Sequence, residues 1–216
     1  MKSSALLLIL AAILYWLSWF LMPDQGTADT KHILTIVSQN RQPVLVSVMV
    51  GILSSVLYLI SLMKINIYLP KTNSYTMTGS VLLAIGAMGM CVDAFFHLFA
   101  FFMTDPSIHM DTNIVQLMTF VQTTGVKFLI PILLPFFIGT SIFSFGLAKL
   151  SVISKLAFYS SIIAFIFAIS GGIISTQILG YGRPLVVLTF LGLFAITQII
   201  IGISFMKVDP KEINLS

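Results

Sequence analysis

Six long runs of apolar residues constrain the fold of this chain more than any other feature. They cover approximately residues 4–22, 43–63, 80–103, 126–149, 154–178 and 184–207. The hydrocarbon core of a bilayer is about 30 Å thick, so a helix needs roughly 20 apolar residues to cross it. We therefore predict an all-α, polytopic transmembrane helix bundle, in which residues 1–216 form a single transmembrane domain of six spans.

Composition excludes several other classes of protein. Of 216 residues, 58% are hydrophobic and 8% are charged, whereas a soluble domain has about 25% charged residues. The eleven Lys and Arg residues are scattered singly, which argues against a nucleic-acid partner. The expected partner is the lipid bilayer. Further candidate partners are a small solute, an ion, a proton, another membrane protein or a second copy of the chain.

Basic residues are distributed unevenly between the two sides of the predicted bundle. In short loops, Lys and Arg favour the cytoplasmic side, so we predict that both termini are cytoplasmic. The short loops also favour a prokaryotic plasma membrane. With this orientation the inner side holds Lys2, Lys64, Lys71, Lys149, Lys155, Lys207 and Lys211, and the outer side holds Lys31, Arg41 and Arg183.

Two outer connections, approximately residues 27–40 and 111–124, are predicted to be amphipathic helices on the surface. Asp29 and Asp111 stand at their starts, where an Asp side chain can accept hydrogen bonds from free backbone N–H groups. A single helix over 114–150 would be about 55 Å long. An interruption is therefore expected, and the polar run 122–125 is the best candidate.

The third apolar run contains Asp93 and His97, which are four residues apart and hence on one face of a helix. A charged side chain at the bilayer centre costs about 2.5–3.5 kcal/mol on insertion scales, so Asp93 needs an explanation. Counting from Ser80, it lies near the midplane. One hypothesis is that Asp93 pairs with His97 or Lys127 and serves a pathway for a solute, an ion or a proton.

Two other hypotheses remain open for the same residues. In one, a protonated Asp93 or a neutral hydrogen bond between Asp93 and His97 holds this helix against its neighbours. Alternatively, Asp93, His97 and the later His109 are candidate metal ligands, since carboxylate and imidazole groups one turn apart can share a metal ion. Lys127 lies either at the outer interface or, if its helix begins near Ile114, at the depth of Asp93.

Other polar residues in the apolar runs suggest interfaces or a cavity. Gln198 is most simply an interhelical hydrogen bonder, although Gln198, Thr123 and Thr124 could also line a cavity. Small residues in the third and fifth runs predict close helix packing. In the fifth run these are Ser161, Ala164, Ala168, Gly171, Gly172 and Ser175.

The sequence contains no recognisable enzyme motif, so no catalytic residue is assigned, no cofactor is favoured, and a role other than catalysis is preferred. The leading hypothesis is transport or sensing of a small solute, an ion or a proton through an intramembrane centre at Asp93 and His97. One alternative is a structural or assembly subunit whose small-residue faces bind partners. A second alternative is a metal-binding membrane oxidoreductase subunit.

Overall fold

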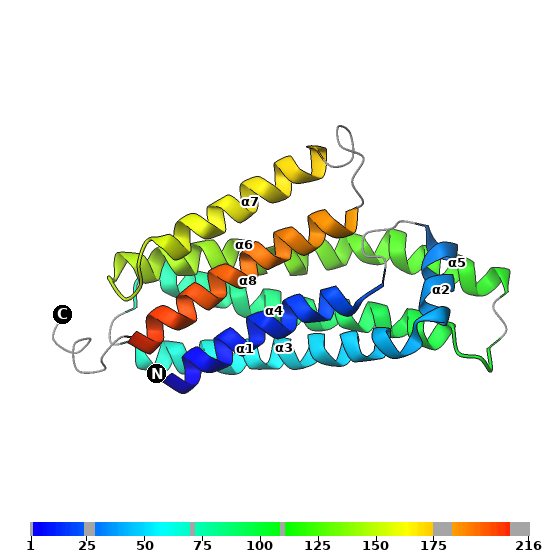
Figure 1. The fold of residues 1–216 in the computed structure, drawn as a ribbon, viewed down its shortest axis with the longest axis horizontal. Coiled ribbons are helices and arrows are strands. Elements are labelled where there is room, and N and C mark those ends of the chain that lie inside the picture. Colours follow the sequence, from blue (N-terminus) through cyan, green and yellow to red (C-terminus); the bar gives the residue numbers. More distant parts are fainter. Residues whose placement is uncertain (1, 24–28, 70–71, 109–110, 175–182, 208–216) are drawn as a thin grey trace.

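The computed structural model describes residues 2–23, 29–69, 72–108, 111–174 and 183–207, and these residues form helices without strands. The longer helices run side by side in one elongated bundle (Figure 1). They are α1 (Lys2–Leu21), α3 (Arg41–Tyr68), α4 (Ser74–Met103), α6 (Val126–Lys149), α7 (Leu156–Ile174) and α8 (Arg183–Lys207). The prediction of an all-α bundle is confirmed.

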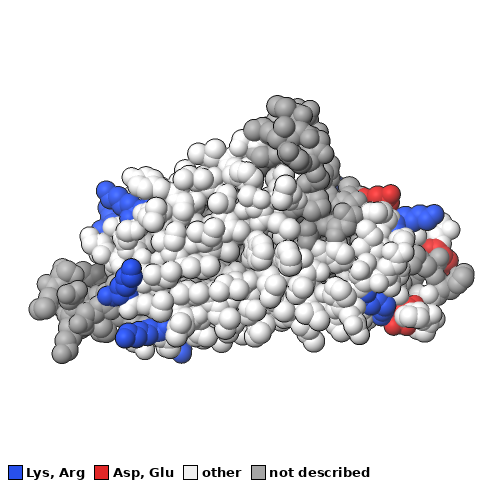
Figure 2. All heavy atoms as spheres, viewed as in Figure 1, with Lys and Arg blue, Asp and Glu red and all other residues white. Residues whose placement is uncertain are grey.

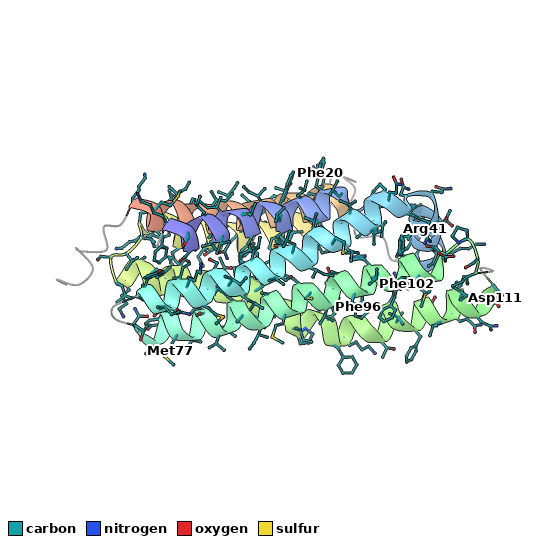
Figure 3. The ribbon with its side chains drawn as sticks, turned by 90° about the horizontal axis from the view of Figure 1, so that it is seen from below. Phe20, Arg41, Met77, Phe96, Phe102 and Asp111 are labelled. Atoms are coloured by element: carbon teal, nitrogen blue, oxygen red, sulfur yellow. The ribbon has the colours of Figure 1, made fainter. Side chains whose placement is uncertain are left out.

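Five of the described helices are long and apolar enough to cross a membrane, namely α1, α3, α4, α6 and α8. The fifth predicted span falls on α7, whose apolar part among the described side chains covers Leu156–Phe167. The chain is therefore an apolar helical bundle of the integral membrane type, and the number of six spans stays a prediction. Side chains such as Phe20 and Met77 project away from the bundle (Figure 3), as expected for surfaces that face lipid.

Charged side chains gather at the two ends of the visible face and leave a band without charge between them (Figure 2). At one end of the bundle α1 and α4 begin and α3, α6 and α8 end. We call it the lysine end, because it carries Lys2, Lys64, Lys149, Lys155 and Lys207. The opposite end carries the short helix α2 (Thr30–Gln39) and is called the α2 end. This placement is consistent with the predicted orientation, although Lys71, Lys211 and both chain termini lie outside the described residues.

Helix α2 crosses the α2 end of the bundle (Figure 1). The side chain of Asp29 accepts hydrogen bonds from the backbone N–H groups of Lys31 and His32, which confirms it as the N-cap. Leu34 and Val37 on the inner face of α2 are buried. They form an apolar cluster with Met22, Val44, Ala100 and Met118.

The predicted surface segment 111–124 behaves differently. Asp111 caps α5 (Thr112–Phe120) as expected, but α5 continues through a π-helical turn, Val121–Gly125, directly into α6. The polar run 122–125 therefore produces a local widening of one continuous helix rather than a break. This widened turn directs Gln122 toward α2, where its Oε1 accepts a 2.5 Å hydrogen bond from Thr30.

Two kinds of small residue hold the bundle together. Ser47, Ser54 and Ser61 on α3 donate hydroxyl hydrogen bonds to the backbone carbonyls of Ser18, Ala11 and Ser4 on α1. The three donors on α3 and the three acceptors on α1 each repeat every seven residues, which keeps them along one line of contact between the antiparallel helices. We call this contact the serine seam.

The contact between α4 and α6 depends on glycine. A Cβ at Gly139 would lie 2.6 Å from the backbone N of Leu83, and one at Gly146 would lie 2.6 Å from the backbone N of Thr76. Real Cβ atoms do not approach backbone atoms so closely, so the absence of a side chain lets the two helices touch backbone to backbone. The small-residue face predicted for the third span is thus used inside the chain.

Candidate functional site

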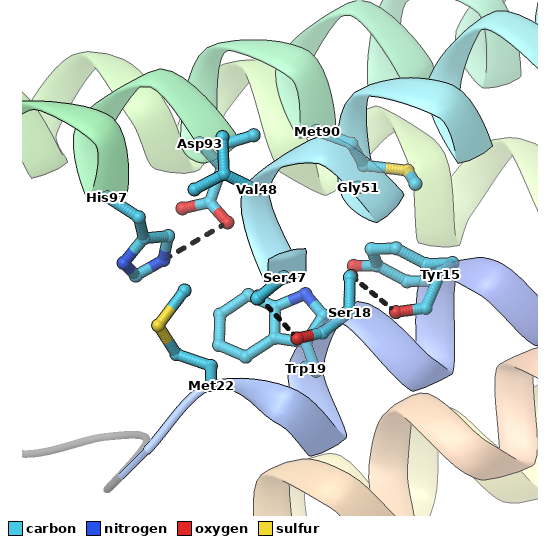
Figure 4. Close-up of a pocket in the computed structure, with 11 residues that line it drawn as sticks. Tyr15, Ser18, Trp19, Met22, Ser47, Val48, Gly51, Met90, Asp93 and His97 are labelled. Atoms are coloured by element: carbon cyan, nitrogen blue, oxygen red, sulfur yellow. Dashed lines mark hydrogen bonds and ion pairs between the residues drawn. The ribbon is translucent and has the colours of Figure 1, made fainter. Parts of the chain in front are cut away.

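A small cavity lies between α1, α3 and α4, near the α2 end of the bundle (Figure 4). The space that the centre of a water molecule can occupy is about 20 Å³, and one water needs about 10–15 Å³ of such space. The cavity therefore accommodates one or two water molecules. Its lining residues are Tyr15, Ser18, Trp19, Met22, Ser47, Val48, Gly51, Met90, Asp93, Ala94 and His97.

Asp93 and His97 both point into this cavity from α4, as their spacing predicts (Figure 4). The His97 Nε2 atom lies 3.7 Å from Oδ2 of Asp93. This separation is too long for a direct hydrogen bond but short enough for strong electrostatic attraction when both groups are charged. A water molecule beside the pair can bond to both.

The side chains of Asp93 and His97 differ in their solvent exposure. The side chain of His97 is 33% exposed and that of Asp93 is 15% exposed. His97 also lies one turn nearer the α2 end of α4 than Asp93. The imidazole therefore stands at the mouth of the cavity and the carboxyl group at its base.

Helix α1 supplies the wall opposite the pair. The indole ring of Trp19 meets the imidazole of His97 edge-on, with ring centroids 6.0 Å apart. Ser18 directs its hydroxyl to the carbonyl of Tyr15 at 2.7 Å, while the carbonyl of Ser18 accepts the hydroxyl of Ser47 at 2.5 Å. The serine seam therefore fixes α1 and α3 beside the cavity.

Glycine at position 51 keeps the cavity open on the α3 side. A Cβ placed there would lie 3.6 Å from Cβ of Ser18 and 3.8 Å from Cβ of Ala94. Those are ordinary contact distances, so a side chain would fit, but it would occupy space between the three helices. Sequence reasoning missed Gly51, Tyr15, Ser18 and Ser47 as lining residues, although the seven-residue spacing of the serines was a usable signal.

Asp93 lies in the half of α4 that is closer to the α2 end of the bundle. The prediction counted from Ser80, but α4 begins at Ser74 with a capping box between Asn73 and Thr76. At 1.5 Å per residue, Asp93 lies about 28 Å from the first residue of α4 and about 15 Å from the last. The site is therefore displaced by about 7 Å from the middle of α4 toward the α2 end, and its depth in a membrane stays a prediction.

Lys127 does not join this centre. Its backbone lies close to the depth of Asp93, because α6 runs antiparallel to α4 with Ile132 beside Gly89 and Phe136 beside Gly86. Its side chain is exposed, however, and does not line the cavity. The glycines also face α6, whereas Asp93 and His97 face α1 and α3.

The remaining candidate residues lie elsewhere. Gln198 is buried and its Nε2 donates a 2.7 Å hydrogen bond to Thr140 of α6, as expected of an interhelical hydrogen bonder. Thr123 is exposed and bonds to the carbonyl of Thr119, and neither Thr123 nor Thr124 lines the cavity. In the fifth run, Ser161 and Ala164 are buried; Ser175 and the side chains of Ala168, Gly171 and Gly172 lie outside the described set.

The third proposed metal ligand cannot be placed with the other two, since His109 lies outside the described residues. Within the described part of the chain, no group of three or more His, Cys, Asp or Glu side chains is close enough to share a metal ion. Asp93 and His97 thus form a two-residue polar centre there.

Comparison with known proteins adds no relative. No protein-family model, no curated protein and no solved structure matches this chain. Its chemistry is therefore argued from its own residues.

Proposed function

We propose that this membrane protein binds and releases a proton at the Asp93–His97 centre, and that this protonation serves transport or sensing of a small solute, an ion or a proton. The observation that carries the proposal is the 3.7 Å pairing of a carboxyl and an imidazole group around a water-sized cavity in an apolar bundle. Histidine is the side chain whose ordinary titration falls between about pH 5 and 8. The pair thus combines two groups that can bind a proton beside a space for water.

In these surroundings a change of charge on the pair has a large electrostatic effect. An ionised Asp93 beside a protonated His97 has no net charge, whereas loss of the imidazole proton leaves one negative charge in a region of low dielectric. Around the cavity, α1 contributes the titratable Tyr15 and α3 contributes no titratable group, while the charged Lys127 of α6 lies outside. No described cation near the pair offsets the negative charge, so uptake of a proton changes the local electrostatic energy substantially.

The size of the cavity limits what it holds in this conformation. Space for one or two waters suits a hydrated proton or a single small cation, and it is too small for an organic solute. A larger substrate would require α1 to move relative to α3 and α4. The proton is thus the ligand that the geometry supports best.

The two alternative functions have less support. A structural subunit would use its small-residue faces to bind partners, but the glycine face of α4 is filled by α6 of the same chain. A metal-binding oxidoreductase subunit would need a third ligand beside Asp93 and His97, and the described residues offer none. On the basis of its short loops we place the protein in a prokaryotic plasma membrane, and the distribution of Lys and Arg places its lysine end in the cytoplasm.

Trp19 provides a direct test, because a protonated imidazole quenches the fluorescence of a neighbouring indole. The chain has two tryptophans, so the experiment uses a Trp16→Phe background in which Trp19 is the sole emitter. We expect emission to fall as the pH is lowered through the titration of His97, and we expect His97→Gln to abolish this response.

The variant Asp93→Asn tests the pairing itself. It keeps the size of the side chain but removes the negative charge 3.7 Å from the imidazole, so the midpoint of quenching should change. An emission that does not depend on pH between about 5 and 8, or a midpoint unaffected by Asp93→Asn, would contradict the proposal.

A further inference from the structure

We propose that the lysine end of the bundle carries a binding site for the headgroup of an anionic phospholipid, formed where α6 connects to α7. The site uses the ammonium groups of Lys149 and Lys155 and the hydroxyl groups of Ser151 and Ser154. It lies away from the cavity, which is near the α2 end. This inference therefore goes beyond the proposed function and does not depend on it.

The positive charge of the lysine end is not balanced by acidic side chains of the described residues. Among these residues, Asp29, Asp105 and Asp111 lie at the α2 end and Asp93 lines the cavity, and no Glu is described. On the face shown in Figure 2, acidic side chains accordingly appear near the α2 end, whereas the opposite end shows basic ones alone. Within the described part of the chain, the lysine end is therefore a surface that attracts anions from outside.

The end of α6 is long enough to reach the lipid headgroups. This helix has 24 residues, which corresponds to about 36 Å at 1.5 Å per residue, whereas the hydrocarbon core of a bilayer is about 30 Å thick. Lys149 in its last turn can therefore extend beyond the hydrocarbon to the level of the lipid phosphates. Tyr75 at the start of α4 and Tyr159 near the start of α7 are both exposed, as is typical of the interface, where Tyr is enriched.

Aromatic side chains hold Lys149 and the start of α7 in place. The Nζ atom of Lys149 lies 4.9 Å from the ring centroid of Tyr75 on α4, within the range of a cation–π contact. The ring of Tyr75 packs edge-on against Phe145 of α6 with centroids 5.0 Å apart, and Phe145 packs against Phe158 of α7 at 5.2 Å. This row of rings joins α4, α6 and α7 next to Lys149, and its apolar surface suits the acyl chains of a bound lipid.

The connection between α6 and α7 is short and held by its own backbone. The N–H groups of residues 150–152 donate hydrogen bonds to carbonyls in the last turns of α6, and the side chain of Ile153 is buried. Ser151, Ser154 and Lys155 are exposed, so one fixed turn presents their polar groups outward. Ser151 has a φ of 59°, in the left-handed region that favours glycine. Serine at this position is therefore better explained by its hydroxyl group than by its backbone preference.

These groups match the chemistry of a phospholipid headgroup. The ammonium groups attract the phosphate, and the serine hydroxyls can donate hydrogen bonds to its oxygens. Two positive charges without a described acidic neighbour favour a lipid with a net negative charge, such as phosphatidylglycerol, over a zwitterionic lipid that carries its own cation. Basic residues beside transmembrane helices recognise anionic headgroups in the same way.

The double variant with Lys149→Gln and Lys155→Gln tests the site. The purified chain in neutral detergent is titrated with short-chain phosphatidylglycerol, and the lipid concentration that gives half of the maximal rise in Tm is measured, because a ligand that binds the folded state raises the Tm. The matched control carries Lys2→Gln and Lys207→Gln, which remove two exposed lysines of the same end on α1 and α8. Ser151→Gly removes a hydroxyl but suits the φ of 59°, so its Tm without lipid should be equal or higher.

We expect phosphatidylglycerol to raise the Tm of the parent and of the control at similar concentrations, and phosphatidylcholine of the same chain length to have little effect. The double variant should need at least about tenfold more phosphatidylglycerol, in line with the loss of two basic residues beside an anionic headgroup. Ser151→Gly should also need more of this lipid than the parent.

Three results would overturn the proposal. The first is equal stabilisation of the parent by phosphatidylglycerol and phosphatidylcholine, and the second is equal stabilisation by inorganic phosphate at the same concentration, which would indicate a site for a free anion. The third is a double variant that responds to phosphatidylglycerol as the control does. None of these results bears on the titration of Trp19 fluorescence, so the proposed function stands or falls separately.

Discussion

The hydroxyl of Ser54 on α3 donates a 2.8 Å hydrogen bond to the backbone carbonyl of Ala11 on α1. This bond is the middle link of the serine seam, with Ser47 and Ser61 one heptad to either side. In lipid, helices gain little from apolar contact alone, so close packing and interhelical hydrogen bonds decide which helices pair. The seam therefore positions α1 against α3, and with it the wall of the cavity that faces Asp93.

Ser54→Ala should destabilise the bundle modestly. Interhelical hydrogen bonds in membrane proteins contribute about 0.6 kcal/mol on average and about 1.7 kcal/mol at most, so we expect a small loss in unfolding free energy in detergent. The triple variant at positions 47, 54 and 61 should lose more. Ser3→Ala, at an exposed position on α1, serves as the control, and equal stability of the triple variant and this control would argue against the seam.

Gly139→Ala should be considerably more harmful than Gly51→Ala. The added methyl at position 139 meets the backbone of Leu83 at 2.6 Å, whereas at position 51 it meets only ordinary contacts at 3.6 Å or more. Overpacking of this kind costs about 1–3 kcal/mol, and the effect is measured by thermal denaturation in detergent. If both variants melt alike, α4 and α6 are not in backbone contact.

The pH dependence of stability at the α2 end should involve Asp105. Hydrogen bonds from the hydroxyl and backbone N–H of Ser107, at 2.6 Å and 3.0 Å, and the nearby Arg41 lower the pKa of Asp105 below its ordinary value of 3.8. Its contribution to stability is therefore present above the ordinary pKa and is lost as the pH falls through the lowered one. An NMR titration should show Ser107→Ala raising this pKa toward 3.8, and an unchanged value would refute the assignment.

Neutralising Lys127 should leave the proton site unaffected. Its side chain is exposed and lies outside the cavity, so Lys127→Gln should preserve both the midpoint and the amplitude of Trp19 quenching. His97→Gln in the same background is the positive control, because it should remove the response. A clear shift of the midpoint in Lys127→Gln would show that Lys127 acts as the counter-ion of Asp93.

Sequence reasoning predicted the architecture well because apolar length determines where helices cross a bilayer. Each of the six predicted runs overlaps a described helix, with residues 175–178 of the fifth run outside the described residues, and the N-caps at Asp29 and Asp111 are confirmed. The third apolar run begins at residue 80, whereas α4 begins six residues earlier, after the capping box at Asn73. The position of Asp93 near the midplane of the membrane stays a prediction.

The partners of Asp93 were harder to predict for a physical reason. Spacing on one helix predicts that Asp93 and His97 share a face, but it does not say which helix covers that face. The answer depends on the serine seam, which brings α1 beside α3, and on the glycine contact, which occupies α6 with the neighbouring part of α4. For this reason the cavity is walled by Tyr15, Ser18 and Ser47 rather than by Lys127.

The position of Asp93 along α4 also has a consequence for access. About 15 Å of helix separates Asp93 from the last residue of α4, and about 28 Å separates it from the first. His97, the more exposed member of the pair, lies one turn farther toward the α2 end. The centre is therefore reached more readily from the α2 end than from the lysine end.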